Sequence, residues 1–254
     1  MPGETDLFLF DTGAGSDTGC LREHNEDSYL SLPSAGVWVV ADGMGGHQAG
    51  DVASGIITGE IESVGVPVSA QDQRARVSER LDRAHNRILS YAAEIGHVTV
   101  GATVVSLLIY EAGFVCMWAG DSRIYLMRNG RLSRLTIDHS EAQELLASGA
   151  LTEEEARNWP RKNVITRAIG IHEGPNYETV TGSVRDEDVF LLCSDGLTEH
   201  LLDEELAELL ADRHLGAQQM VDRLIDETLR RGARDNVSCI VVRCLPRYHE
   251  VHQH

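Results

Sequence analysis

Three aspartates in the sequence stand at the edges of short apolar runs. Asp42 and Asp195 each follow such a run and are each followed by glycine, and Asp235 comes just before the apolar run 237–242. A carboxylate at the end of a buried strand is held rigidly, and glycine beside it allows a ligand to approach the backbone closely. Grouped carboxylates repel one another unless cations neutralise them, and oxygen ligands suit Mg²⁺ or Mn²⁺.

Further acids extend this set of possible metal ligands. Glu26 and Asp27 lie in a polar segment, Asp121 lies in a turn, and no His or Cys accompanies them at the spacing of a zinc site. Two divalent ions about 3.5–4 Å apart can activate water for in-line attack on phosphorus. The forked guanidinium of Arg22 can bind a pair of phosphate oxygens. These residue types favour metal-assisted phosphoester hydrolysis, although sequence spacing does not establish that the acids converge.

The elements that must position these acids follow from the periodicity of the apolar residues. The apolar runs 37–41, 188–193 and 237–242 are typical of buried strands, and the residues around 98–135 form further strand-like runs joined by short turns. The turns favour antiparallel hairpins. Helical spacing predicts helices at 48–64, 71–95, 199–212 and 217–231.

Residues 138–182 interrupt this pattern. We predict a helix at 140–148 and a second at 152–157, where Thr152 and Glu155 form a capping box. A basic cluster follows, which consists of Arg157, Arg161, Lys162 and Arg167. The segment is interpreted either as a cover over the site that contacts substrate, or as a surface insertion with solvated charges.

Composition limits the classes of function. The chain has 254 residues, 42% of them hydrophobic, and a net charge of −18, which argues against nucleic acid or an anionic membrane as the main partner. The N-terminus lacks the basic start of a signal peptide, and the apolar segment 98–110 is too short and too interrupted to span a bilayer. Five cysteines without a C-x-x-C pair indicate reduced thiols. We therefore expect a cytoplasmic protein.

The ordered motifs resemble those of the metal-dependent protein phosphatases of type 2C, in their compact bacterial form. Seven motifs carry the resemblance, which covers about residues 15–243: Arg22-x-x-Asn25-Glu26-Asp27, Ala41-Asp42-Gly43-Met-Gly-Gly-His47, Gly101-Ala-Thr103, Ala119-Gly-Asp121-Ser-Arg123, Thr166-Arg-Ala-Ile-Gly170, Ser194-Asp195-Gly196-Leu197 and Asp235-Asn236-Val237-Ser238. The resemblance implies an α+β fold, a four-layer α-β-β-α sandwich of two antiparallel sheets flanked by helix pairs. It also implies one catalytic domain over residues 1–254 with a flap at about 138–182, which favours contact between the flap and substrate.

The same resemblance implies a role for each acid. Asp42 matches the aspartate that bridges two Mn²⁺ or Mg²⁺ ions, and the carbonyl of Gly43 binds one of them. Asp195 and Asp235 complete the coordination of the other ion. Glu26 binds the second ion or its waters.

Three further residues take roles by the resemblance. Asp27 orients metal-bound water, and Arg22 holds the substrate phosphate. Asp121 and Asp195 match the acids that hold a weaker third metal in bacterial members. Asn236 and Thr103 are expected to support the ligands rather than to bind metal.

The proton donor is the point at which the chain departs from part of the family. Some members have a histidine directly after the Asp-Gly pair, where this chain has Met44. His47 is one candidate for the general acid, because an ordinary histidine pKa of about 6.5 suits protonation of a leaving alkoxide. A metal-bound water is the other candidate.

The resemblance implies a monomeric phosphatase that hydrolyses phosphoserine and phosphothreonine in proteins, without a phosphoenzyme, and opposes a Ser/Thr kinase. A phosphatase of a phosphorylated anti-sigma antagonist is the nearest alternative, because it shares the chemistry and differs in its partner. A pseudophosphatase that only binds phosphoproteins is disfavoured, since every ligand position is intact. A phosphodiesterase or nuclease fits poorly with the acidic composition.

Overall fold

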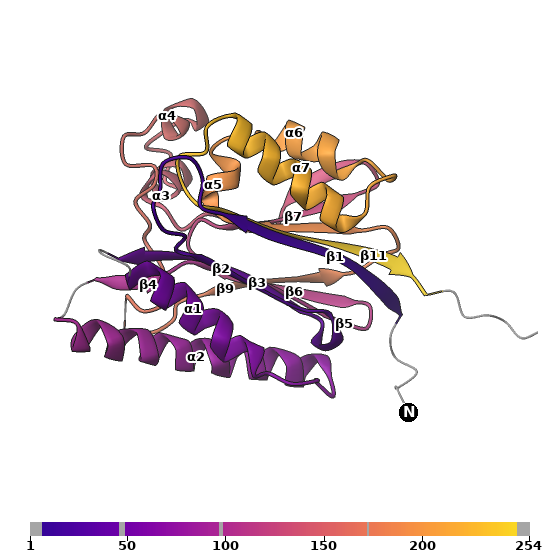
Figure 1. Ribbon diagram of the computed structural model, residues 1–254, viewed down its shortest axis with the longest axis horizontal. Helices are drawn as coiled ribbons and strands as arrows, with labels where there is room; N and C mark the ends of the chain where they lie inside the picture. Colours follow the sequence, from indigo (N-terminus) through magenta and orange to yellow (C-terminus); the bar gives the residue numbers. More distant parts are fainter. Residues whose placement is uncertain (1–6, 46–48, 97–98, 172, 248–254) are drawn as a thin grey trace, which may run out of the picture.

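Two antiparallel β-sheets stack face to face, and a pair of helices covers the outer face of each (Figure 1). The computed structural model describes residues 7–45, 49–96, 99–171 and 173–247. This is the expected four-layer α-β-β-α sandwich. No helix among these described residues is long and apolar enough to cross a membrane.

The first sheet has the strand order β1-β11-β10-β7-β8. Its strands are β1 (Phe8–Asp17), β11 (Val237–Pro246), β10 (Val189–Cys193), β7 (Arg123–Arg128) and β8 (Arg131–Arg134). Helices α6 (Asp203–Leu210) and α7 (Ala217–Arg230) cover its outer face. The chain therefore brings its first and last long strands together along one edge.

The second sheet has the order β2-β3-β5-β6-β9, with β4 paired to β3. Its strands are β2 (Asp27–Leu32), β3 (Val37–Gly45), β4 (Val100–Ala102), β5 (Val104–Tyr110), β6 (Gly113–Ala119) and β9 (Glu178–Ser183). A short 3-10 turn at Pro33–Ala35 joins β2 to β3. Helices α1 (Ala49–Glu62) and α2 (Ala70–Glu94) cover this sheet.

The first half of strand β3 shows why a central strand can be apolar at successive positions. Its residues alternate between two apolar layers: Val37 and Val39 pack toward α1 and α2, whereas Trp38 and Val40 pack toward the other sheet. All four side chains are fully buried. A strand with both faces covered has no solvent-facing positions, so its sequence is a continuous apolar run rather than an alternating one. This burial fixes the position of Asp42 at the strand's end.

The prediction of one helix over 199–212 was wrong. The structure has α5 (Asp195–Thr198) and a separate α6 that begins at Asp203. The helix restarts because the Glu205 carboxylate accepts a hydrogen bond from the backbone N–H of Leu202 at 2.9 Å, which caps the new first turn. Asp195 consequently lies in the first turn of a helix, rather than in a loop ahead of one.

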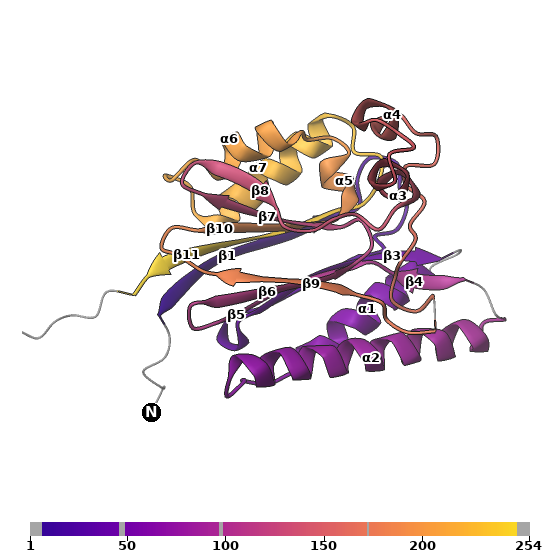
Figure 2. The ribbon, with the colours of Figure 1, turned by 180° about the vertical axis from the view of Figure 1, so that it is seen from behind.

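The segment after β8 contains α3 (Glu141–Ala147) and α4 (Glu153–Arg157), which lie with α5 at one end of the sandwich (Figure 2). The capping box predicted at Thr152 and Glu155 is present, with bonds of 2.8 and 3.3 Å. Residues 178–182, which we placed in the flap, are part of β9 and pair with β6. Their pairing with β6 places the end of the insertion before Glu178.

Candidate functional site

Pairing of β2 with β3 brings the first group of acids together. Asp27 lies directly opposite Asp42 in the antiparallel register. The backbone N–H of Gly43 donates to the carbonyl of Glu26 at 3.0 Å, which continues the ladder beyond β2. Glu26, Asp27 and Asp42 therefore lie at the same end of the second sheet.

Glycine at two positions allows helix α1 to approach this group. A Cβ on Gly43 would lie 2.0 Å from the carbonyl oxygen of Gly50, and a Cβ on Gly50 would lie 2.7 Å from the Cδ of Glu26. The backbone of Gly50 donates a hydrogen bond to the Glu26 carboxylate and lowers its pKa, although burial is the larger effect and raises it. Any larger residue would separate the helix from the acids.

The end of the first sheet supplies Asp195 and Asp235. Asp195 follows β10, and Asp235 precedes β11, the strand paired with β10. A Cβ on Gly196 would lie 2.0 Å from the carbonyl oxygen of Asn236, so only glycine allows these two turns to pack together. Both acids thus project from neighbouring strand ends.

A buried serine connects the two sheets at this end. The Ser194 hydroxyl donates to the Asp27 carboxylate at 2.8 Å and accepts from the backbone N–H of Ser238 at 3.0 Å. Ser194 and Ser238 are completely buried. Ser194 belongs to the motif Ser194-Asp195-Gly196-Leu197, and the sequence indicates no role for its hydroxyl. Only the stacking of the two sheets shows that it orients Asp27.

Mutual repulsion and burial raise the pKa values of the grouped acids. Burial is the largest cause in each case: it raises the pKa of Asp27 to about 6 and that of Asp121 to about 7. The pKa of Asp42 is raised well above its ordinary value by burial and by the charges of Asp27, Asp195, Asp121 and Asp235. The acids of the two sheets therefore lie close enough for their charges to act on one another.

The acid group fits hard divalent cations. Asp42 and Asp195 lie among other carboxylates yet keep part of their surface open to solvent, so an ion can reach them. One carboxylate oxygen of Asp121 is buried without a hydrogen-bond partner among the described residues. Cations would relieve both the repulsion and this unpaired oxygen.

Carboxylates alone do not complete a coordination shell here. As placed in the described part of the chain, no three His, Cys, Asp or Glu side chains come together around one ion. Carboxylates that share one ion would therefore have to move closer together when it binds, and backbone carbonyls and water would complete the shell. Mg²⁺ commonly retains several waters in this way.

Arg22 belongs to the same site. Its guanidinium contacts the Asp235 carboxylate at 2.7 Å, and the Arg22 side chain is 52% exposed. The hydrogen bond that Arg22 donates to Asp235 is the main cause that raises the pKa of Arg22, with smaller contributions from the charges of Glu26 and Asp42. A permanent positive charge thus borders the acids and faces solvent, where a phosphate group can reach it.

Asn236 and Thr103 make the supporting contacts that the sequence analysis expected of them. Asn236 accepts from the backbone of Glu26 at 2.9 Å and donates to the carbonyls of Thr18 and His24. Thr103 donates its N–H to the carbonyl of Asp42 at 2.8 Å, and its hydroxyl bonds that of Ser122 at 2.7 Å. Their polar groups are used to fix the backbone around the acids.

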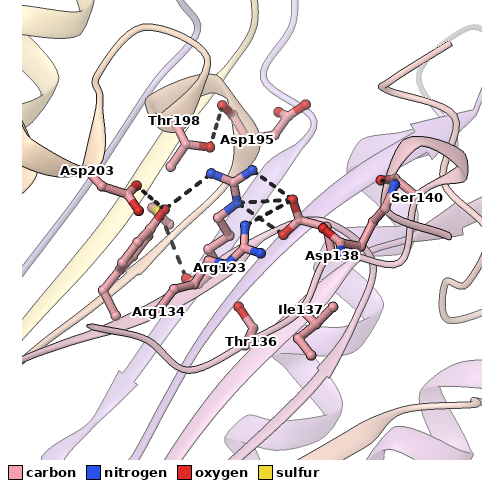
Figure 3. Close-up of polar contacts among 12 residues, drawn as sticks. Arg123, Arg134, Thr136, Ile137, Asp138, Ser140, Asp195, Thr198 and Asp203 are labelled. Atoms are coloured by element: carbon pink, nitrogen blue, oxygen red, sulfur yellow. Dashed lines mark hydrogen bonds and ion pairs between the residues drawn. The ribbon is translucent and has the colours of Figure 1, made fainter. Parts of the chain in front are cut away.

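Arg123 and Asp138 form a connection that the sequence analysis missed. Figure 3 shows the Arg123 guanidinium directed at the Asp138 carboxylate, with contacts of 2.7–3.2 Å. Arg134 approaches the same carboxylate at 3.5 Å. The pair joins the turn of Asp121 to the start of the insertion. Arg123 lies in the Gly-Asp-Ser-Arg motif, but nothing in the sequence links it to Asp138.

The imidazole of His139 holds the same turn from the other side. The ring accepts from the N–H of Gly120 at 3.2 Å and stacks on Trp118. Its backbone N–H donates to the Gly120 carbonyl at 2.9 Å. His47, the candidate proton donor, lies outside the described residues.

Comparison with known proteins points to one family. The family model described as Protein phosphatase 2C matches residues 22–239. The serine/threonine phosphatase stp of Listeria welshimeri is 32% identical over 89% of this chain and 93% of its own length. A structure of the catalytic domain of the serine/threonine protein phosphatase PstP in complex with two manganese ions has a TM-score of 0.85 at 31% identity, covering 94% of this chain and 99% of that one. PppA, a component of the type VI secretion system (T6SS) of Pseudomonas aeruginosa, has a TM-score of 0.85 at 38% identity and covers 93% and 98%.

Proposed function

Because the chain belongs to the protein phosphatase 2C family, we propose that the acids at the end of the sandwich hold the metal ions of a protein serine/threonine phosphatase. The phosphatase activity and the two-metal centre of Mn²⁺ or Mg²⁺ are properties of this family, and its relatives carry both. The assignment of individual residues is our proposal. The observation that supports it best is geometric: Asp27 lies opposite Asp42 in the second sheet, and Ser194, next to Asp195 at the end of the first sheet, donates to Asp27 at 2.8 Å.

We assign the metal ligands as follows. Asp42 would be shared by both ions, the Gly43 carbonyl would bind one of them, and Asp195 and Asp235 would bind the other. Glu26 binds the second ion or its waters. Two such ions, when bound, lower the pKa of water and neutralise charge on the phosphoryl oxygens.

The remaining residues act on substrate and water. Arg22 binds the phosphoryl oxygens through its exposed guanidinium, and the Asp27 carboxylate, oriented by Ser194, holds water for in-line attack. The leaving alkoxide takes a proton either from His47 or from water. Because no side-chain nucleophile is used, phosphate is released in a single displacement.

Phosphate release from a panel of phosphoserine and phosphothreonine peptides, with Mn²⁺ and with a chelator, tests this function. We expect turnover only with metal. A protein that binds the same phosphopeptides without hydrolysing them in Mn²⁺ would instead be a pseudophosphatase. Competition with a phosphotyrosine peptide tests the residue preference at the same time.

Arg22→Ala is expected to raise the KM for a phosphothreonine peptide by about tenfold, because it removes a charge-assisted contact with the phosphate. Arg22 contacts the assigned ligand Asp235 at 2.7 Å but is not itself a ligand, so the metal affinity measured by calorimetry is expected to change much less than KM. Arg83→Ala, on an exposed part of α2, is the matched control. A loss of metal affinity without a change in KM would contradict the role given to Arg22.

Asp121→Ala is expected to leave two ions bound and to lower kcat, because Asp121 and Asp195 are assigned to a third, weaker ion. Metal stoichiometry by native mass spectrometry at rising Mn²⁺ concentration checks this directly. Removal of a buried carboxyl with a raised pKa also relieves repulsion, so we expect the metal-free variant to unfold at a higher temperature than the wild type. Three tightly bound ions in the variant would refute the assignment.

We further propose that the protein acts in the cytoplasm as a monomer with one catalytic domain, and that residues 138–177 form a flap over the site. Its substrates are phosphorylated serine and threonine proteins, and a cognate Ser/Thr kinase is its expected opponent. A phosphorylated anti-sigma antagonist is the alternative substrate. Dephosphorylation of each purified phosphoprotein at equal concentration separates the two.

A further inference from the structure

A pocket of about 210 Å³ opens beside the acids, between the body of the protein and the segment that carries α3 and α4. Asp121 and Asp195 form part of its wall, so it adjoins the proposed third-ion position. Arg134, Arg157 and Lys162 also line it. The volume is below the ~300–1,000 Å³ of pockets that hold drug-sized ligands, so the pocket suits one side chain.

The basic cluster identified in the sequence divides into two pairs. Arg161 contacts Glu141 at 2.8 Å and Arg167 contacts Glu178 at 2.6 Å, so both arginines hold the insertion together. The other two bases of the cluster, Arg157 and Lys162, line the pocket.

The positive charges of Arg134, Arg157 and Lys162 are only weakly balanced by nearby acids. Arg157 has a single partner among the described residues, Glu153 at 3.5 Å, and both side chains are more than three-quarters exposed. An exposed pair of this kind contributes little. No ion pair of Lys162 is found in the described ranges. Arg134 reaches Asp138 only at 3.5 Å, because Arg123 occupies that carboxylate more closely (Figure 3).

The pocket has an excess of positive charge, because most of its acids are neutralised by an arginine or by the proposed metal ions. Asp138 is neutralised by Arg123, and Asp121 and Asp195 are ligands of cations in the proposed function. Glu199 is the one remaining acid of the lining, against the three bases. The whole chain carries a net charge of −18 and contains a single lysine, Lys162. A positive pocket in so acidic a protein attracts an anionic group to this place.

We propose that Arg134, Arg157 and Lys162 form a specificity pocket for an anionic side chain of the substrate, either a carboxylate or a second phosphoryl group, on a residue near the one that is hydrolysed. This inference rests on the proposed function, because the pocket adjoins the same metal site. It names a preferred substrate class: phosphoproteins with an additional negative charge close to the phosphorylated serine or threonine.

A positional peptide series tests the proposal. One phosphothreonine is placed in an alanine background, and glutamate is moved through the positions on either side. We expect kcat/KM to rise about fivefold at a preferred position, chiefly through KM, because a partly exposed ion pair gives a modest gain. A second series with phosphothreonine in place of glutamate shows which anion the pocket prefers. If kcat/KM equals that of the all-alanine peptide at every position in both series, the inference is overturned.

Charge reversal assigns the preference to the pocket. In Arg157→Glu with Lys162→Glu, the ratio of acidic to neutral peptide is expected to fall below one, and a peptide with lysine at the same position becomes the better substrate. The ratio is taken within each variant, so changes in folding or metal loading cancel. Arg83→Glu on α2 is the control of equal charge change and keeps the wild-type ratio. An acidic preference that survives in the double variant would overturn the inference.

The single lysine allows a measurement that does not use activity. An amine-acetylating reagent can label only the Lys162 ε-amine and the terminal amine, and mass spectrometry separates the two. We expect the acidic peptide to protect Lys162 more than the alanine peptide does, and equal protection would count against the pocket. Hydrolysis of a small aryl phosphate with Mn²⁺ tests the proposed function separately. If it and every peptide fail to react, the proposed function is wrong, whereas equal reaction of all peptides removes only the pocket.

Discussion

Asp42→Asn is expected to abolish hydrolysis of a phosphothreonine peptide, with a fall in kcat of at least ~10³-fold. Asp42 lies opposite Asp27 in the sheet, and the charges of Asp27, Asp195, Asp121 and Asp235 all raise its pKa. An amide of the same shape cannot neutralise or bridge two cations. Steady-state kinetics in saturating Mn²⁺ measure the loss.

The same substitution separates a metal defect from a folding defect. Asparagine removes repulsion from the acid group, so the metal-free variant is expected to be at least as stable as the metal-free wild type in thermal unfolding. Asp82→Asn, at an exposed position of α2, is the matched control and is expected to retain activity. Near-wild-type turnover of Asp42→Asn in Mn²⁺ would disprove the bridging role.

The metal-free protein is expected to lose stability as the pH rises from about 5 to 8. The folded-state pKa values of Asp27 and Asp121, about 6 and about 7, lie above the ordinary value of 3.8. Up to these folded pKa values the folded state retains protons that the unfolded state has released, so the free energy of unfolding falls as the pH rises through them and then levels off. The full rise for Asp27 corresponds to roughly 3 kcal/mol, of which roughly half falls above pH 5.

Urea unfolding at pH 5 and pH 8 measures this dependence, with a chelator in one series and Mn²⁺ in the other. Bound cations stabilise the charged carboxylates, so Mn²⁺ is expected to remove the loss at pH 8. Asp27→Asn should show a shallower dependence in the chelator. An increase in stability from pH 5 to 8 without metal would show that folding does not raise the pKa values of Asp27 and Asp121.

The individual strands and helices were predictable because their burial shows in the apolar pattern, whereas the four-layer arrangement was expected only from the resemblance to the type 2C phosphatases. The run that ends at Asp42 is apolar at successive positions, as a strand covered on both faces requires, and the helical spacing of residues 71–95 matches α2. The break between α5 and α6 was not predictable. Glutamate is common inside helices, so the sequence does not show that Glu205 caps the start of a new one.

The sequence by itself determined which residue types can do the chemistry and their order along the chain. It could not determine their convergence. The bond from Ser194 to Asp27 joins residues 167 positions apart, and the Arg123–Asp138 pair depends on where the insertion returns to the body. The sequence also did not show which residues of the basic cluster form close ion pairs, since nothing near the four bases in the chain distinguishes them. Only the stacked sheets decided these contacts, because side chains remote in sequence meet only when buried faces pack.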